Sequence, residues 1–442
     1  MEETNKLGVM PIPKLLFSTA VPLMLSMLLQ AFYNVVDSVF VSRISENALS
    51  AVSLAFPAQN MLIAFGVGTN LGVNAFLSRS LGEGNRKQVN VIANHAIFLW
   101  IVQSLVFALI GFSLAGPFFR MQTEDPEIIK YGADYFRICV GLSFGLFGQF
   151  CFERLLQATG RAVESMVIQV VGAVINIILD PIFIFVFDLK VAGAAYATVA
   201  GQIIAAFLGI YINHRKNKDI SISMRGFRPD GSIVKRIYQI GLPSIVMQSM
   251  TSVLNFCLNL ILIGFTSTAT AVLGVYYKLE NFFFLPLFGM TNALVPIVSY
   301  NMGAGKRDRM MSAIKLTTAV SLVMMTLGAL VLLIFPKALL SLFNAGENML
   351  AIGIPALRII CFIFPLAAVS IVKSSVLQAC GSSFYSLLVS LIRQMIVLLP
   401  AAYLLSLTGK LELVWLAFPI SELAGFIACG VFYRKFITKL DI

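Results

Sequence analysis

The stretch QVNVIANHAIFLWIVQSLVFALIGFSLAGPFF, residues 88–119, contains no aspartate, glutamate, lysine or arginine. A helix needs about 20 predominantly apolar residues to cross the hydrocarbon core of a bilayer, and this stretch is longer than that. A second uncharged stretch covers residues 316–336. Apolar residues follow one another in both stretches instead of alternating with polar ones. The pattern therefore predicts membrane-spanning helices rather than the strands of a barrel.

The composition extends this prediction to the whole chain. Hydrophobic residues make up 58% of the 442 residues and charged residues 12%, and the mean hydropathy is +0.89. Soluble domains carry about 25% charged residues, so we expect an integral membrane protein. The charges lie in short segments, and between them we expect twelve spans, near residues 15–38, 52–78, 89–116, 131–158, 162–187, 191–213, 234–262, 270–298, 311–335, 352–378, 383–407 and 411–436.

The net charge of +11 is concentrated in loops on one side of the predicted membrane. The clearest is HRKNKDISISMRGFRPDGSIVKR, residues 214–236, which is typical of a cytoplasmic loop. The opposite loops hold six basic residues, namely Arg43, Arg120, Lys130, Lys190, Lys337 and Lys410. We therefore expect both termini in the cytoplasm, with residues 1–14 as a short polar tail. No basic stripe is interleaved with aromatic residues, so nucleic acid is not an expected partner.

The two halves of the chain repeat at a constant offset in the numbering, which is the offset between Pro22 and Pro243. At that offset QATG (157–160) matches QACG (378–381), and LGEGNR (81–86) matches MGAGKR (302–307). Six spans per repeat is an even number, so both copies enter the membrane from the same side and form parallel repeats.

The repeat predicts the architecture. We expect an all-α membrane protein in which two pseudo-symmetric six-helix bundles, with twelve transmembrane helices between them, surround a central cleft. The expected parts are an N-terminal lobe with a cation site (1–213), a basic cytoplasmic linker (214–233) and a C-terminal lobe (234–442).

One carboxylate interrupts the apolar run NIILDPIFIF, residues 176–185. A charged side chain at the centre of a membrane helix costs about 2.5–3.5 kcal/mol on insertion scales, so Asp180 needs a partner or a cavity. Asn176 lies one turn earlier on the same face. Pro181 has no N–H, which frees the carbonyl of Ile177. Such oxygen ligands suit a hard monovalent cation, and the buried carboxylate suits a proton equally.

A second pair of polar residues, Asn34 and Asp37, shares one face of the first span in YNVVDSVF (33–40). Thr198 adds a hydroxyl in the sixth span. The alternative is that these aspartates snorkel or are satisfied by neighbouring amides. The repeat argues against it, because the polar residues Asp37, Asn176, Asp180 and Thr198 correspond to Leu258, Val397, Ala401 and Pro419. Residues needed only by the shared fold would occur in both copies, so we expect an ion site in the N-terminal half.

Two further acids, Glu153 and Glu280, are candidates for a substrate cavity. Glu280 lies among aromatic residues in YYKLENFFFLPLFG (276–289), which could stack on a lipophilic cation. For both acids the alternative is a buried ion pair with Lys373 or Arg393. Glu422 is expected to pair structurally with Arg393. The two histidines are far apart in sequence and form no catalytic or metal-binding set, so neither an enzyme nor a resident cofactor is expected.

The segments YNVVDSVFVSR, QATG, NIILDP and VSYNMGAGKR resemble those of the multidrug and toxic compound extrusion (MATE) family, and its bacterial DinF/MepA-like branch in particular. The resemblance covers essentially the whole chain. It implies a multi-pass transporter of the bacterial inner membrane that works by alternating access as a monomer. Such proteins export lipophilic, mostly cationic drugs in exchange for inward Na⁺ or H⁺.

The resemblance also implies roles for particular residues. The cation site would comprise Asp37, Asn176, Asp180 and Thr198. Pro22 would act as a hinge in the first span, and the substrate cavity would include Gln30, Tyr33, Asn34, Glu153 and Glu280. Another branch of the family couples through an acid on the tenth span, where this chain has Lys373. The nearest rival function is a flippase for a lipid-linked saccharide precursor. An ion channel and a non-transporting membrane scaffold are more distant rivals.

Overall fold

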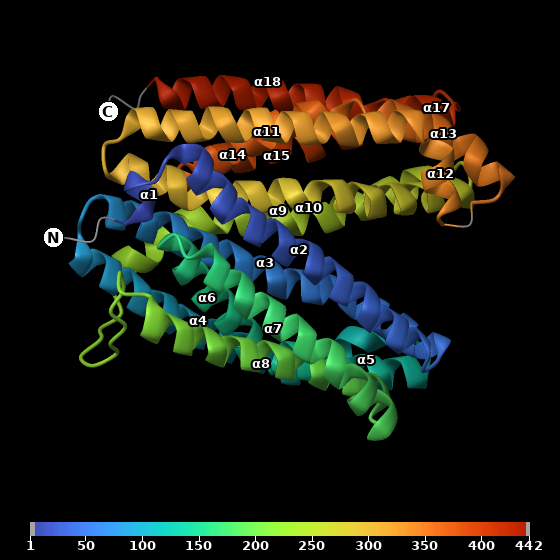
Figure 1. Cartoon of the computed structure of the whole chain (residues 1–442). Helices are drawn as coiled ribbons and strands as arrows, with labels where there is room; N and C mark the ends of the chain where they lie inside the picture. The colour runs from blue at the N-terminus through green and yellow to red at the C-terminus, as the bar shows by residue number, and fades with distance from the viewer. Residues whose placement is uncertain (1–4, 344, 439–442) are drawn as a thin grey trace.

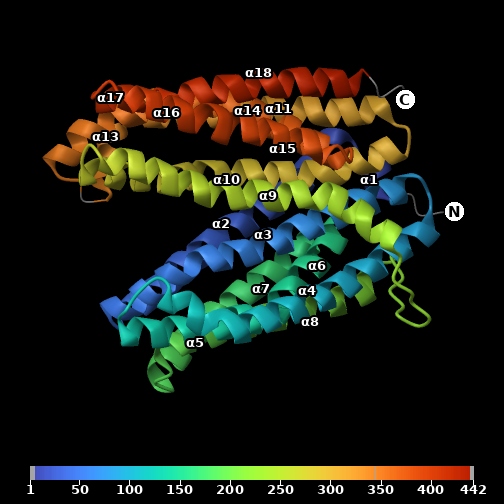
Figure 2. The same ribbon diagram turned by 180° about the vertical axis from the view of Figure 1, so that it is seen from behind.

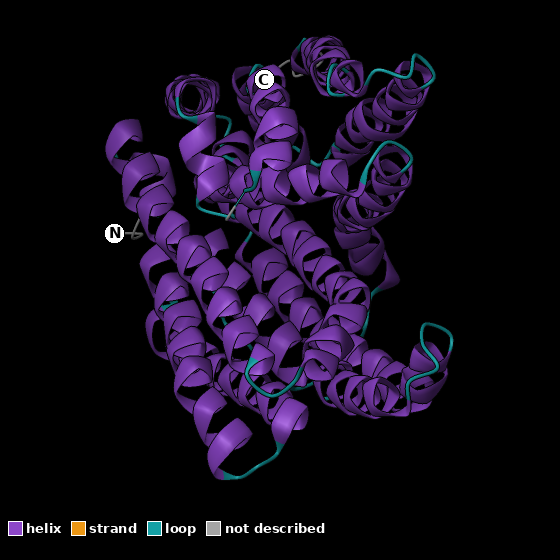
Figure 3. Ribbon diagram, turned by 90° about the vertical axis from the view of Figure 1, so that its right-hand side faces the viewer, coloured by secondary structure: helices purple, strands orange, loops and turns teal. Residues whose placement is uncertain are grey.

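The structure is a computed structural model that describes residues 5–343 and 345–438, and this part of the chain is helical with no strand (Figure 3). Two bundles of long helices lie side by side (Figure 1). The first half contains α1 (Lys6–Val9), α2 (Ile12–Ser42), α3 (Glu46–Gly82), α4 (Arg86–Arg120), α5 (Pro126–Gly141), α6 (Phe144–Ala158), α7 (Ala162–Pro181), a π-helical turn η1 (Ile182–Val186) and α8 (Lys190–Lys216).

The second half repeats this order. It contains α9 (Gly231–Ile263), α10 (Ser267–Gly303), α11 (Arg307–Ile334), α12 (Pro336–Ser341), α13 (Glu347–Ile360), α14 (Ile363–Ala379), α15 (Ser383–Leu391), the π-helical η2 (Ile392–Leu398), α16 (Leu399–Ser406), α17 (Leu411–Val414) and α18 (Ala417–Ile437). Both the helical fold and the two-bundle arrangement predicted from the sequence are confirmed.

Within the described residues, eleven helices are long and apolar enough to cross a membrane. The remaining predicted span, the tenth at 352–378, is the helix pair α13 and α14, which meet at an angle of 47°. Pro365 explains the break, because it has no N–H to offer the carbonyl of Cys361. The amide of Phe364 bonds that carbonyl instead, at 3.2 Å, and the chain turns there.

The repeat is visible in the helix boundaries and in the contacts. Helix α3 begins at Glu46 and α10 begins at Ser267, which are equivalent positions of the repeat, and the two helices also end at equivalent positions. The hydroxyl of Ser78 donates to the carbonyl of Ala158 at 2.9 Å, and the hydroxyl of Ser299 donates to that of Ala379 at 2.8 Å. These two bonds are also equivalent under the repeat, so the two bundles share internal packing as well as sequence.

Helices α2, α3, α9 and α10 form the contact between the two bundles. Glycines permit this contact. A Cβ atom on Gly82 would collide with the carbonyl of Tyr300, and one on Gly303 would collide with the carbonyl of Arg79. These contacts lie at the end of the molecule that carries both termini, and the bundles diverge toward the other end (Figures 1 and 2). The two bundles are therefore held together from one side.

Candidate functional site

Asp37 of α2 and Asp180 of α7 are far apart in sequence, but the fold places their carboxyl groups close enough to interact. Asp180 is completely buried, at 0% exposure. Within the described residues, Oδ1 of Asp37 and Oδ2 of Asp180 are buried and have no hydrogen-bond partner. Two acidic groups thus share one enclosed position inside the first bundle.

Asn176 and Thr198 complete this cluster. Nδ2 of Asn176 donates to Oγ1 of Thr198 in α8 at 3.1 Å, and it lies 3.5 Å from Oδ1 of Asp180. Oδ1 of Asn176 is also buried without a hydrogen-bond partner in the described part of the chain. Three oxygen acceptors of one cluster therefore lack a donor. An arrangement of this kind can take up a proton or a small cation, because buried acceptors are normally satisfied.

The backbone of α7 and α8 explains how Asn176 reaches Thr198. Gly201 of α8 lies against Gly172 of α7, and a Cβ atom on Gly201 would be 2.6 Å from the carbonyl oxygen of Gly172. Because neither residue has a side chain, the two helices approach closely. Helix α7 then continues through Pro181 into the π-helical turn η1. Such wide turns occur frequently at functional sites.

The predicted cavity residues of α2 differ from one another in their surroundings. They are Gln30, Tyr33 and Asn34. Oε1 of Gln30 accepts a hydrogen bond from Nε2 of Gln169 in α7 at 2.7 Å. Tyr33 lies near Gln30 and near both aspartates of the cluster. Asn34 is exposed, and no hydrogen bond among the described residues joins it to Asp37. Helical spacing places Asn34 and Asp37 on neighbouring positions, but only Asp37 turns into the bundle.

Pro22 lies inside the continuous helix α2 and is buried. It cannot donate to the carbonyl of Ser18, so the helix lacks one internal bond there. The hydroxyl of Ser26 donates to the carbonyl of Pro22 at 3.0 Å. This is the position where the resemblance to the MATE family implies a hinge. The weakened backbone is compatible with bending.

Sequence reasoning missed two neighbours of Asp37 and a residue bonded to one of them. Tyr135 and Cys139 of α5 both lie near its carboxyl group, and Nε2 of Gln59 donates to the hydroxyl of Tyr135 at 3.0 Å. Cys139 is buried, as expected of a small apolar residue. Only Gln59 carried a signal in the sequence, because it is the repeat counterpart of Glu280. The proximity of α5 to α2 depends on packing that hydropathy does not encode.

Glu153 and Arg154 form a separate polar group on α6. Glu153 is buried and accepts a hydrogen bond from Nε2 of Gln149 at 2.8 Å. Nη1 of Arg154 donates to Oε1 of Gln157 at 2.9 Å and to Oδ1 of Asn292 in α10 at 3.2 Å. The second bond joins the two bundles. Arg154 therefore belongs to the contact between the halves.

Glu280 lies in the second bundle, away from the aspartate cluster. It lies near Tyr276, Arg393 and Glu422. Nη1 of Arg393 is 3.3 Å from Oε2 of Glu422, which confirms the predicted structural pair.

Lys373 lies instead over the rings of Phe426 and Tyr433. Among the described residues, neither Lys373 nor Arg393 forms an ion pair with Glu153 or Glu280. The buried ion pairs that the sequence allowed for these two acids are therefore not formed. Glu153 instead accepts a hydrogen bond from the uncharged Gln149, and Glu280 lies beside the uncharged Tyr276.

Comparisons with known proteins agree with this architecture. The chain is 26% identical over 422 residues to the multidrug export protein MepA of Staphylococcus haemolyticus, covering 95% of this chain and 93% of the relative. It is 27% identical over 444 residues to an FAD transporter of Shewanella oneidensis, covering 97% and 96%. A solved outward-facing structure of a multidrug resistance MATE family transporter superposes with a TM-score of 0.93 at 23% identity, covering 100% of this chain and 99% of that one.

The family comparison reproduces the internal repeat. The MatE family model matches the chain twice, over residues 22–182 and again over residues 243–404. The two matches begin at equivalent positions of the repeat, namely the prolines inside α2 and α9. Together they cover most of both helical bundles. The chain belongs to the MatE family of membrane transporters.

Proposed function

We propose that the protein is a secondary active antiporter that exports lipophilic, mostly cationic drugs in exchange for Na⁺ or H⁺ moving inward. The observation that supports this most directly is the cluster of Asp37, Asn176, Asp180 and Thr198. It holds three buried oxygen atoms without a donor in the described structure. It also occurs in one bundle only, because its repeat counterparts are apolar. An asymmetric acidic site in a symmetric scaffold is better explained by function than by folding.

The structure has the form expected of one state in an alternating-access cycle. The bundles touch at the end that carries the termini and diverge at the other (Figure 1). With both termini in the cytoplasm of a bacterial inner membrane, as the basic loops predict, this form opens outward. The coupling ion would then reach the aspartate cluster from outside, and drug would leave in the same direction.

Coupling requires the ion to bind the two states of the transporter unequally. Asp37 belongs to α2 and Asp180 to α7, and α2 also packs against α10 of the other bundle. A cation or proton shared by the two carboxyl groups removes their mutual repulsion and draws these helices together. In this proposal the movement of α2 displaces the drug outward, and release of the ion on the inner side resets the site.

Proteoliposomes containing the purified chain test the proposal. Ethidium efflux is measured under an imposed Na⁺ gradient and, separately, under an imposed pH gradient. We expect efflux to follow at least one gradient and to be abolished in Asp37→Asn and Asp180→Asn. The matched control is Asp134→Asn, which removes an acid of the same bundle whose side chain is 41% exposed in an ion pair with Arg137. Normal gradient-driven efflux in Asp180→Asn would contradict the proposal.

A second candidate substrate class is anionic. One relative is an FAD transporter, and Arg154 contributes a buried guanidinium group at the contact between the bundles. FAD is therefore included as a competitor in the ethidium assay. Inhibition that depends on Arg154 would favour an anionic substrate. The lipid-linked saccharide flippase has no comparable support, since the relatives described above carry other cargo and few basic residues lie within the spans.

A further inference from the structure

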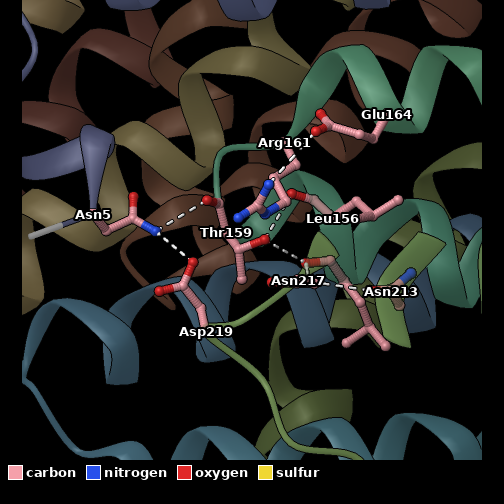
Figure 4. A network of polar contacts seen from close by, with 9 residues as sticks. Asn5, Leu156, Thr159, Arg161, Glu164, Asn213, Asn217 and Asp219 are labelled. Carbon is pink, nitrogen blue, oxygen red and sulfur yellow. Dashed lines mark hydrogen bonds and ion pairs between the residues drawn. The ribbon is translucent and has the colours of Figure 1, made fainter. Parts of the chain in front are cut away.

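The sequence predicts a short polar tail at the start of the chain. The first described residues do not form a free tail of this kind. They include the short helix α1, which lies between the two bundles near their point of contact (Figure 1). Nδ2 of Asn5 donates to the carbonyl of Thr159 at 3.0 Å and to Oδ2 of Asp219 at 3.1 Å (Figure 4). Both partners belong to the first half of the chain. The side chain of Asn5 thus fixes the segment to the first bundle and to the loop that leaves it.

Apolar packing adds to this attachment. Leu7 is completely buried, and a Cβ atom on Gly160 would lie 3.1–3.3 Å from Lys6 and Leu7. Burial lowers the pKa of the Lys6 ammonium group, and nearby Glu164 opposes that shift. The loop around Gly160 and the side chains of α1 are therefore in close contact. The side chains of residues 5–7 thus pack against the first bundle in this state.

The carbonyl groups of the same segment are held by the second bundle. Nη2 of Arg309 donates to the carbonyl of Met10 at 2.7 Å and to that of Leu7 at 3.3 Å. Nζ of Lys306 donates to the carbonyl of Gly8 at 2.9 Å. The last carbonyls of a helix have no partner inside it, and cationic side chains commonly satisfy them. Lys306, which precedes α11, and Arg309, in the first turn of α11, perform this role.

Two uncharged residues reinforce the second attachment. Nδ2 of Asn301 donates to the carbonyl of Leu7 at 3.1 Å, and Nε of Arg309 donates to Oδ1 of Asn301 at 3.2 Å. Gly8 lies against the ring of Tyr300, where a Cβ atom would be 2.7 Å from Cε1. A larger residue than glycine would push the segment away from α10. The segment therefore touches both bundles through specific bonds and through close packing.

The repeat shows that these contacts are not part of the shared scaffold. The positions of Lys306 and Arg309 correspond to Asn85 and Gln88 in the first copy. Neither can supply the charge that satisfies the carbonyls of α1. As with the aspartate cluster, the charged groups occur in one copy only. Their presence in the second copy matches the place where the segment crosses between the bundles.

We propose that residues 5–10, here named the N-terminal latch, hold the two bundles together at the terminus-bearing end and must detach from Lys306 and Arg309 when that end opens. This inference rests on the proposed alternating-access cycle. The latch continues through Pro11 into α2, which carries Asp37. Movement of α2 during ion binding is therefore transmitted directly to the latch. Opening of the terminus-bearing end breaks one set of its bonds, because separating bundles cannot both retain it.

Distances between spin labels on the two bundles test the latch in the full chain with its six native cysteines replaced. His214→Cys and Lys435→Cys place labels at the terminus-bearing ends of α8 and α18. Lys130→Cys and Ala351→Cys place labels on α5 and α13 at the other end. All four positions are exposed, and each pair is related by the repeat.

Two sets of variants weaken the latch. The first combines Lys306→Gln with Arg309→Gln, and the second is the smaller change Asn5→Ala. In the double variant we expect more molecules in which the terminus-bearing ends of the two bundles are separated. The ratio of such molecules to those with the ends joined should rise about tenfold, which corresponds to about 1.4 kcal/mol. The 130–351 distance should shorten in the same molecules. Asn5→Ala should shift both distances in the same directions by a smaller amount.

Lys315→Gln is the matched control, because it removes an exposed charge of α11 outside the latch contacts. It should leave both distance distributions as they are in the unmodified chain. Unchanged distances in both latch variants would overturn the inference, and so would an equal shift in Lys315→Gln.

The measurement requires neither drug nor ion, so it does not depend on the assignment of the coupling site. A chain whose two distances never respond to Na⁺, pH or ethidium would contradict the alternating-access proposal and the latch with it. A chain that switches normally but ignores the latch variants would contradict the latch alone.

Discussion

Arg393 and Glu422 form an ion pair in the second bundle, with 3.3 Å between Nη1 and Oε2, at the two positions that Gly172 and Gly201 occupy in the first bundle. The same pair of helix positions is thus used in two ways. Glycines let α7 and α8 approach closely in one copy, and a charged pair links η2 to α18 in the other. This exchange explains how two related bundles can differ in their polar interiors.

The ion pair predicts a specific pattern of stability. Glu422→Leu should destabilise the folded chain by about 3 kcal/mol, because removing one partner of a buried pair leaves the other charge uncompensated. The side chain of Glu422 is 6% exposed and that of Arg393 is 26% exposed, which places the loss at the low end of the usual range. Thermal unfolding of the purified protein in detergent measures it.

The control for this prediction is the double replacement of Glu422→Leu with Arg393→Met. It removes both charges, so most of the lost stability should return. A double variant as unstable as Glu422→Leu would mean that packing volume, and not the unpaired charge, causes the loss. Gradient-driven efflux of the folded double variant would show separately whether the pair has any part in transport.

The contact between Gly201 and Gly172 supports a second prediction. Gly201→Ala should push α8 away from α7 and separate Thr198 from Asn176. Overpacking of this kind costs about 1–3 kcal/mol, so we expect the apparent affinity for the coupling ion to fall by about one order of magnitude or more. The ion-concentration dependence of ethidium efflux measures the change.

Gly430→Ala is the matched control, because a Cβ atom at Gly430 in α18 would meet no other atom within 4 Å. It should not alter the ion dependence. A normal ion dependence in Gly201→Ala would mean that the close approach of α7 and α8 does not position Thr198. Helix α8, which carries the hydroxyl of Thr198, would then be dispensable for ion coupling.

Much of this architecture follows from the sequence, and the parts that do not follow share a physical cause. Hydropathy is a local property, so it locates the spans, and the constant offset between the two halves pairs the bundles before any contact is known. Helical spacing also places Asn176 beside Asp180, because both lie on α7. Spacing alone cannot tell that Asn34 faces outward while Asp37 faces inward. That difference depends on which helices cover each face of α2.

Contacts between distant segments were the hardest to predict. Tyr135 and Cys139 approach Asp37 only because α5 packs near α2. The sequence predicts a short polar tail over residues 1–14, and nothing in it indicates that carbonyl groups of residues 5–10 will bind Lys306 and Arg309. Bonds to backbone carbonyls do not depend on side-chain identity at the acceptor. A sequence pattern therefore cannot reveal where such a segment docks.

The hydrogen bonds donated by Ser78 and Ser299 are equivalent under the repeat, so we expect them to contribute equally to the free energy of unfolding. Ser78→Ala and Ser299→Ala should each lower the free energy of unfolding by about 1 kcal/mol, the usual net value of such a hydrogen bond. Each hydroxyl donates to a carbonyl at the end of an equivalent repeat helix, at 2.9 and 2.8 Å. Denaturation of the two variants under identical conditions checks the prediction. A large difference between them would show that the bundles are not energetically equivalent.

The bond between Arg154 and Asn292 joins the bundles near the polar group of Glu153, and its energy can be isolated. The acceptor position differs between the two copies of the repeat, because Asn292 corresponds to Leu71 in the first copy. Leucine is therefore a compatible replacement at the equivalent site. We expect Arg154→Met and Asn292→Leu to show a coupling energy of about 1.5–3 kcal/mol in a double-mutant cycle, because the donor carries a charge.

The free energy of unfolding of the unmodified chain, the two single variants and the double variant gives this coupling. Pairing Arg137→Met with Asn292→Leu provides the control, since Arg137 is 46% exposed and pairs with Asp134 on its own helix. Exposed pairs of that kind contribute little, so its cycle with Asn292 should show no coupling. Coupling near zero for Arg154 as well would mean that the guanidinium group is held by Gln157 alone. The two bundles would then meet without this polar bond, through their glycines, the N-terminal latch and contacts such as that of Gln103 with Tyr238.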